Sequence, residues 1–248
     1  MASREEMSTS FGRDAARYES GRPDYPAEAV AWLLEPVVVP GRRPRVADVG
    51  AGTGKLTRAL RELEAEVVAV DPDAAMLAEL RRRVSGTPAY VGTAERMPLP
   101  DASVDAVVAG QAWHWVDPVA GAAEAGRVLR RSGVLGLIWN VRDDGVAWVR
   151  RLTGIMHGSA AEQLVAEGGP QPHPPFASFQ SRVWEWGRPL GREMFLDMVA
   201  SRSYVITAGE TARRSILDEV GELFDELADD GVVTLPYRTE AFRAVAAR

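Results

Sequence analysis

Short apolar runs alternate with segments of helical periodicity through the first half of the chain. Apolar residues recur at helical spacing from Lys55 and again after Asp73, and Asp117-Pro118 is typical of a helix start, for a helix expected to reach Arg130 or Arg131. Strand–helix alternation of this kind predicts an α/β fold, with a parallel sheet and helices on both faces. The runs that predict strands span residues 45–50, 66–71, 89–92, 104–110 and 133–140.

The rhythm changes after Asn140. Residues 141–180 contain one or two helical segments and then a loop rich in Gly and Pro. A strand is expected at 181–186, helices at 193–199 and 210–227, and a last strand at 232–246, where Pro236 indicates an edge strand or a bulge. Near the beginning of the chain, Pro26 is typical of the first turn of a helix.

Composition narrows the class of protein. The chain has 248 residues, of which 46% are hydrophobic, enough for one large domain with a sizeable core. A formal net charge of −6 gives no electrostatic case for a nucleic acid or an anionic membrane as partner. No cysteine is present, and the three scattered histidines lack a zinc-binding pattern, so no metal site is expected.

The opening residues and the length of the apolar runs indicate where in the cell the protein is expected. The opening "MASREEMSTS" lacks the apolar core of a signal peptide, and no apolar run is long enough to span a membrane. We therefore expect a soluble cytoplasmic protein without a membrane partner.

A glycine-rich turn, "VADVGAGTGKLT", follows the first predicted strand. A phosphate-binding loop would need a glycine where Val49 stands and Ser or Thr where Leu56 stands. A dinucleotide fingerprint would need its third glycine at the position of Lys55. The turn therefore matches neither motif for binding phosphates.

Two acidic residues indicate a different ligand. Asp48 lies just before the turn, where a carboxylate would repel a pyrophosphate and attract an ammonium group. Asp71 ends the second predicted strand, about twenty residues after the first glycine, which is the distance at which an acid accepts hydrogen bonds from ribose hydroxyls. A ribose carried by a cationic molecule without phosphate describes S-adenosylmethionine.

With these motifs the sequence resembles the class I S-adenosylmethionine-dependent methyltransferases, in their small-molecule, type 11-like branch. "VADVGAGTGKLT", "VVAVDPDAAML" and "VGTAERMPLPDASVDAVVAGQAWHW" are similar to the signatures of that family. The resemblance implies a Rossmann-like seven-stranded, mostly parallel sheet with an antiparallel last strand and a helical lid or insertions. It implies that S-adenosylmethionine is held by Asp48, Gly50, Ala51, Gly52, Asp71, Pro72, Met76, Thr93, Ala94, Glu95 and Gln111. Of these, the resemblance places Met76, Thr93, Ala94 and Glu95 beside adenine.

The same resemblance suggests how the chain is organised. We expect a single methyltransferase domain over residues 1–248. A helical cap would occupy residues 1–40, the cofactor-binding core residues 41–140, and acceptor-site insertions with the C-terminal strands residues 141–248. The residues expected to bind the acceptor are Tyr18, Arg22, Trp113, Asn140, Arg142 and Tyr204.

His114 is the candidate catalytic residue. It stands between Trp113 and Trp115, just past the fourth predicted strand, at the carboxyl edge where open α/β sheets bind ligands. An imidazole there could take a proton from the acceptor as a general base. The alternatives are that His114 only shapes the pocket, and that the two tryptophans pack the following helix onto the sheet.

The sequence thus predicts methyl transfer from S-adenosylmethionine to a small molecule by a monomer or homodimer. The predicted acceptor is an acidic metabolite or natural product, because arginines are expected around it. Two alternatives stay open at this point. One is a methyltransferase fold used for ligand binding or for a non-methyl reaction such as cyclisation, and the other is a nicotinamide oxidoreductase.

Overall fold

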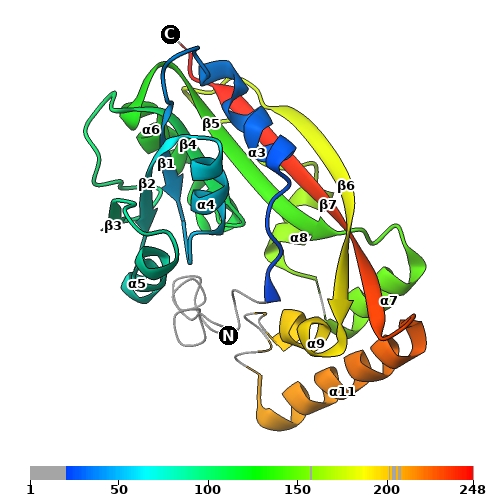
Figure 1. The fold of residues 1–248 in the computed structure, drawn as a ribbon. Helices are drawn as coiled ribbons and strands as arrows, with labels where there is room; N and C mark the ends of the chain where they lie inside the picture. The colour runs from blue at the N-terminus through cyan, green and yellow to red at the C-terminus, as the bar shows by residue number, and fades with distance from the viewer. Residues whose placement is uncertain (1–20, 157, 201, 203–204, 206–207, 248) are drawn as a thin grey trace. The chain divides into compact units, whose positions relative to one another are not determined.

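The computed structural model describes residues 21–156, 158–200, 202, 205 and 208–247, and its centre is a seven-stranded sheet (Figure 1). The strand order is β3-β2-β1-β4-β5-β7-β6; β1 to β5 run parallel and β7 is antiparallel. This confirms the predicted fold class. The strands are β1 (Arg45–Val49), β2 (Glu66–Asp71), β3 (Ala89–Val91), β4 (Val104–Gly110), β5 (Leu129–Arg142), β6 (Gln180–Gly191) and β7 (Val232–Val245).

Helices of the described residues follow β1, β2 and β4, whereas β3 leads to β4 without a helix, and two helices precede each of β6 and β7. Asp73 and Asp117 cap two of them, each accepting hydrogen bonds from two backbone N–H groups of the first turn, as predicted. The helices are α3 (Ala27–Leu34), η2 (Glu35–Val37), α4 (Lys55–Glu62), α5 (Ala74–Arg83), η3 (Trp113–Trp115), α6 (Pro118–Val128), α7 (Ala147–Met156), α8 (Ala160–Ala166), α9 (Arg192–Ala200) and α11 (Glu210–Leu227).

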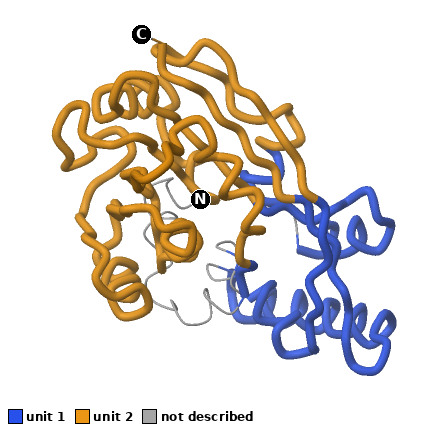
Figure 2. Tube along the Cα trace, turned by 45° about the horizontal axis from the view of Figure 1, so that its top comes forward, with its two compact units in different colours: residues 1–23, 140–163, 185–238 blue, residues 24–139, 164–184, 239–248 orange. Residues whose placement is uncertain are grey.

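The chain forms two compact units, coloured separately in Figure 2. Unit 2 comprises residues 24–139, 164–184 and 239–248, and unit 1 comprises residues 1–23, 140–163 and 185–238. Unit 1 has its own core, in which side chains of α7, α9 and α11 pack against those of β6 and β7. The predicted division of the chain at residues 40 and 140 stays a prediction.

The core of unit 2 lies between the sheet and the helices that follow its strands. Residues of α3 and α4 pack against Val67 of β2, and residues of α5 pack against Ala69 of the same strand. Residues two apart on a strand point to the same face. Therefore α3, α4 and α5 cover one face of the sheet, and the carboxyl ends of β1 and β2 lead directly into the turns before α4 and α5.

Two element boundaries differ from the sequence prediction. Helix α6 ends at Val128 and not near Arg130, and β5 begins at Leu129. The N–H groups of Ala102 and Ser103 donate to the carbonyls of Arg127 and Val128, and Leu129 then pairs with Val104. These long-range backbone bonds outweigh the helical pattern of the sequence.

The last two strands also differ in part from the prediction. Strand β6 extends to Gly191, beyond the expected end at Trp186. Strand β7 lies between β5 and β6, so of the two alternatives predicted for Pro236 the edge strand is wrong, while the bulge stays a prediction. Pro236 has no N–H to donate, but its carbonyl accepts a hydrogen bond from the N–H of Asp143. Strand β7 therefore stays hydrogen-bonded to the segment after β5.

Candidate functional site

The glycine turn after β1 has the backbone that its sequence predicts. Gly50, Gly52 and Gly54 all have positive φ, at +67°, +54° and +92°, and residues other than glycine rarely adopt such backbone angles. Gly50 is also needed for space, because a Cβ there would lie 2.5 Å from the Cβ of Ala112, just after β4. The turns that follow β1 and β4 are therefore in close contact.

Asp71 fixes this turn to the end of β2. Its Oδ2 accepts from the N–H of Gly52 and its Oδ1 from the N–H of Asp73, both at 2.8 Å. Asp71 is 7% exposed, and burial raises the pKa of its carboxyl although these two N–H bonds oppose the rise. A carboxylate has about four lone-pair sites, so each oxygen retains capacity for a ribose hydroxyl.

Asp48 is buried completely at the end of β1. The hydroxyl of Thr57 in α4 donates to its Oδ2 at 2.5 Å, whereas its Oδ1 is buried and has no hydrogen-bond partner among the described residues. Burial raises the pKa of Asp48 to about 7, and the charge of Asp71 adds to this rise. A cation beside these two carboxyl groups would relieve both effects.

These observations test whether S-adenosylmethionine fits the turn. The unsatisfied Oδ1 of Asp48 suits an ammonium donor, and the paired oxygens of Asp71 suit ribose hydroxyls. Gly52 has open space where a Cβ would stand, so no side chain of the turn fills that position. The residues present therefore fit this molecule, which supplies an electrophilic methyl group on sulfur when it is bound.

The residues expected around adenine lie on α5 and on the loop after β3. Met76 is 3% exposed and Ala94 is 5% exposed, so both belong to the packed wall of unit 2, while Thr93 and Pro72 are exposed. Glu95 accepts a hydrogen bond at 2.9 Å from the N–H of Asp117, which ties this loop to the start of α6. Their contact with adenine stays a prediction.

Arg127 and Glu124 of α6 fix the part of this loop that follows Glu95. Arg127 of α6 donates to the carbonyls of Met97 and Leu99, and pairs with Asp101 and Glu124. Glu124 in turn accepts from the N–H of Met97 at 2.7 Å. The loop that is expected to face adenine is thus fixed to α6 at several points.

The end of β4 positions the candidate catalytic residue. Gln111 has φ of +56° and its N–H donates to the carbonyl of Ile138. His114 is half-buried in η3, and its Nδ1 accepts from the indole Nε1 of Trp139 at 3.4 Å. Trp113 is 5% exposed, and its ring would lie 3.1 Å from a Cβ on Gly121 of α6. Its position is that of a packing residue, and its contact with an acceptor stays a prediction.

The remaining predicted acceptor residues belong to unit 1. Arg142, at the end of β5, is 4% exposed and forms an ion pair of 2.9 Å with Glu162 of α8. Asn140 is 8% exposed and Arg22 is half-buried. Tyr18 and Tyr204 lie outside the described residues.

The sequence did not point to several side chains that the structure brings together. Glu162 is placed near both Arg142 and Arg202, and Arg202 is 9% exposed. Burial alone would raise the pKa of Glu162, but the two guanidinium groups and the hydrogen bonds from Ser159 hold it below its usual value. Arg202 stands between Val199 and Val205, both fully buried, and a charged residue between two valines was the one available signal.

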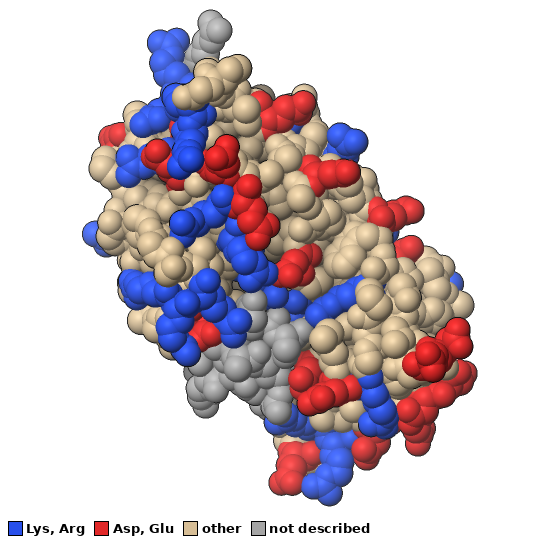
Figure 3. Space-filling model, viewed as in Figure 1, with Lys and Arg blue, Asp and Glu red and all other residues tan. Residues whose placement is uncertain are grey.

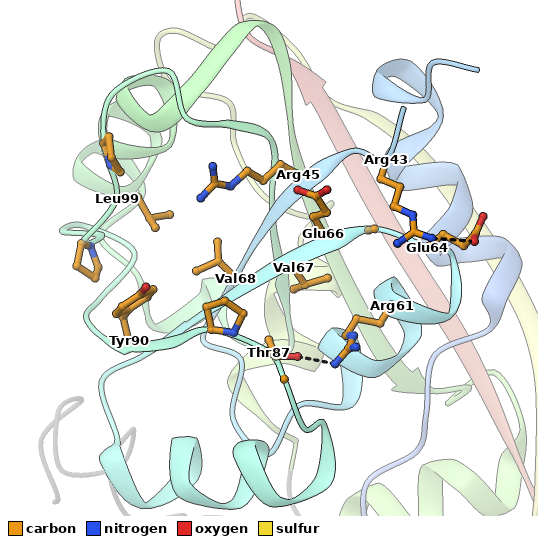
Figure 4. Close-up of a pocket in the computed structure, with 15 residues that line it drawn as sticks. Arg43, Arg45, Arg61, Glu64, Glu66, Val67, Val68, Thr87, Tyr90 and Leu99 are labelled. Carbon is orange, nitrogen blue, oxygen red and sulfur yellow. Dashed lines mark hydrogen bonds and ion pairs between the residues drawn. The ribbon is translucent and has the colours of Figure 1, made fainter. Parts of the chain in front are cut away.

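A cavity of about 750 Å³ opens elsewhere on unit 2 (Figure 4). It is lined by residues at the amino ends of β2 and β3, including Glu66 and Pro88, and by Arg61, which bonds Thr87. The glycine turn lies at the carboxyl end of β1, so this cavity is distinct from the proposed cofactor site.

On the face in Figure 3, basic and acidic side chains are interspersed. No helix in the described part of the chain is long and apolar enough to cross a membrane.

Comparisons with known proteins identify the family of the chain. A family described as methyltransferase domain matches residues 47–137. An uncharacterized methyltransferase of Mycobacterium tuberculosis is 46% identical over 250 residues, covering 99% of this chain and 99% of that protein. A malonyl-(acyl-carrier protein) O-methyltransferase of Enterobacter lignolyticus is 35% identical over 131 residues, covering 52% of this chain and 51% of that protein. The structure of a proposed type II methyltransferase from Anaeromyxobacter dehalogenans has a TM-score of 0.69 at 27% identity, covering 91% of this chain and 97% of that one.

The chain therefore belongs to the class I S-adenosylmethionine-dependent methyltransferases. It is a methyltransferase with S-adenosylmethionine as its cosubstrate, which confirms the predicted enzyme class and cofactor.

Proposed function

We propose that this enzyme methylates an oxygen of a small carboxylic acid. The observation that carries the proposal is the buried charge of unit 1, where Arg142 and Arg202 share one carboxylate, Glu162. The Nε of Arg202 is buried and has no hydrogen-bond partner among the residues described. An anionic ligand would supply the missing hydrogen-bond partner and would offset the buried charge of Arg202.

The chemistry of such an acceptor suits the rest of the site. An ionised carboxyl oxygen forms the new O–C bond with its own lone pair, while the electrons of the C–S bond pass to sulfur. No proton leaves the acceptor, and charge is quenched in the step. The enzyme then has to align the reactants and exclude water. The relative from Enterobacter lignolyticus, which is named an O-methyltransferase, supports oxygen as the attacked atom.

The test uses the full chain, methyl-labelled S-adenosylmethionine and a bacterial small-molecule extract. A methyl ester releases its label as methanol in mild alkali, whereas methyl groups on nitrogen, carbon or an ether oxygen do not. We expect alkali-labile label, and the labelled acid can then be identified by mass spectrometry. Label that resists alkali would refute the proposed oxygen of an acid.

A pair of variants tests the buried arginines. Arg202→Met should raise KM for the acid at least about tenfold, because a charged hydrogen bond is worth about 1.5–3 kcal/mol, and should leave the Kd of S-adenosylmethionine unchanged. Arg192→Met is the matched control, since Arg192 pairs with Asp225 on the exposed surface of the same unit. An unchanged KM in Arg202→Met would remove this residue from the acceptor site.

A further inference from the structure

Tyr237 carries a buried hydroxyl group without a partner. The residue lies in β7 and is 2% exposed, and its hydroxyl has no hydrogen-bond partner among the residues that the structure describes. Its ring is held by Trp186 of β6, which stacks on it with ring centroids 5.0 Å apart and an interplanar angle of 17°. A phenol buried in this way usually has a hydrogen-bond partner. The unpaired hydroxyl of Tyr237 therefore needs an explanation.

The pairing of β5 with β7 places this tyrosine beside Arg142. The two strands are neighbours, and the N–H of Asp143 donates to the carbonyl of Pro236. Near the other ends of the strands, the N–H of Ala246 donates to the carbonyl of Gly133. Both bonds belong to one antiparallel register, in which the tyrosine stands directly opposite Arg142 with no backbone hydrogen bond between the two. The side chains of such a pair leave the same face of the sheet, with Cβ atoms about 4.5–5.5 Å apart.

Arg142 connects Tyr237 to the buried ion pair of unit 1. Its Nη2 lies 2.9 Å from Oε1 of Glu162, and the charge of Arg202 also acts on that carboxylate. The Nε of Arg202 is buried and likewise has no hydrogen-bond partner in the described part of the chain. All four residues belong to unit 1. One unit thus holds a hydroxyl and a guanidinium N–H that are both buried, unpaired and able to donate to an oxygen atom.

We propose that Tyr237 is a specificity-determining residue of the acceptor site, and that its hydroxyl donates a hydrogen bond to an oxygen of the bound acid. The acid then supplies the partner that the phenol lacks in the ligand-free protein, as it does for the Nε of Arg202. An analogue without that oxygen leaves the buried hydroxyl unpaired and is rejected. This inference rests on the proposed function, because that function has the acid bound at Arg202.

The ligand-free protein provides the first test, which needs no acceptor. Tyr237→Phe removes only the hydroxyl and keeps the ring that stacks on Trp186. Because the hydroxyl has no partner in the free protein, the urea midpoint of Tyr237→Phe should equal or exceed that of the wild type. A lower midpoint, or a variant that does not fold, would mean that the hydroxyl already has a structural partner, and would overturn the proposal.

Turnover of the acid found in the ester assay provides the second test. Tyr237→Phe should raise KM for the acid at least about tenfold, because a hydrogen bond to a charged group is lost, and should leave the Kd of S-adenosylmethionine unchanged. Tyr90→Phe is the control, since Tyr90 is 48% exposed and belongs to unit 2, and it should change neither constant. An unchanged KM in Tyr237→Phe would exclude this hydroxyl from acceptor binding.

The two proposals can fail separately. If the extract yields only label that resists alkali, the proposed function fails, and KM is then compared for the acceptor that carries this label. A rise of about tenfold or more in Tyr237→Phe would keep Tyr237 in the acceptor site, whereas an unchanged KM would remove it.

Discussion

Asp48→Asn should stabilise the ligand-free protein by an amount that grows with pH. The carboxyl group is fully buried, and burial raises its pKa from 3.8 to about 7. The folded state therefore prefers the protonated acid, and its stability relative to the unfolded chain falls as pH rises from about 4 to 7. Asparagine has nearly the same shape, stays neutral, and can still accept the hydrogen bond that Thr57 donates.

The size of the effect follows from the pKa difference. The rise from 3.8 to about 7 at about 1.36 kcal/mol per unit corresponds to about 4 kcal/mol at pH 8. The same treatment gives about 1.6 kcal/mol at pH 5, where the unfolded chain has already lost most of the proton. The gain from Asp48→Asn should therefore increase by roughly 2–3 kcal/mol between pH 5 and pH 8.

Urea unfolding of the wild type and of Asp48→Asn at pH 5, 6, 7 and 8, without S-adenosylmethionine, measures this increase. Asp105→Asn is the control, because Arg42, Arg130 and the N–H of Arg45 hold the pKa of Asp105 below its usual value. Its loss of stability should be the same at all four pH values. A pH-independent difference for Asp48→Asn would refute the argument, because it would mean that Asp48 is ionised throughout.

Two further predictions concern cofactor affinity. Asp71→Ala should weaken S-adenosylmethionine binding more than tenfold, because ribose hydrogen bonds to a carboxylate are worth about 1.5–3 kcal/mol each; equal affinities in calorimetry would exclude Asp71 from the site. Arg127→Met removes the bonds to Leu99, Asp101 and Glu124, so hydrogen exchange in residues 95–103 should accelerate, and the Kd of S-adenosylmethionine should rise by up to about tenfold. Unchanged exchange there would show that the loop does not depend on this clamp.

The parts of the fold that could be predicted from the sequence are those set by local patterns. The positive φ of Gly50 and the caps at Asp73 and Asp117 follow from the residue types themselves. The end of α6 at Val128 does not, because backbone bonds from residues 102–103 decide it. Segments that are distant in sequence must be placed in space before such bonds can be known.

In the candidate site, too, some contacts could be predicted from the sequence and others could not. The position of Asp71 at a strand end could be read from an apolar run and a spacing. Its two backbone partners are local to the turns that this spacing defines. The bond from Trp139 to His114 joins residues 25 positions apart, and no periodic pattern encodes it. That contact therefore appears only in the folded structure.

The division of the chain into two units has an evolutionary consequence. The glycine turn, Asp71 and the loop after β3 all lie in one uninterrupted stretch of unit 2, residues 24–139, whereas most of unit 1 comes from the later stretches 140–163 and 185–238. Mutations in the later stretches can accumulate without altering any of those residues proposed for the cofactor site. Duplicated genes could thus retain the ancestral methyl donor while diverging toward new acceptors, and the selective constraint on the two parts would differ from the outset.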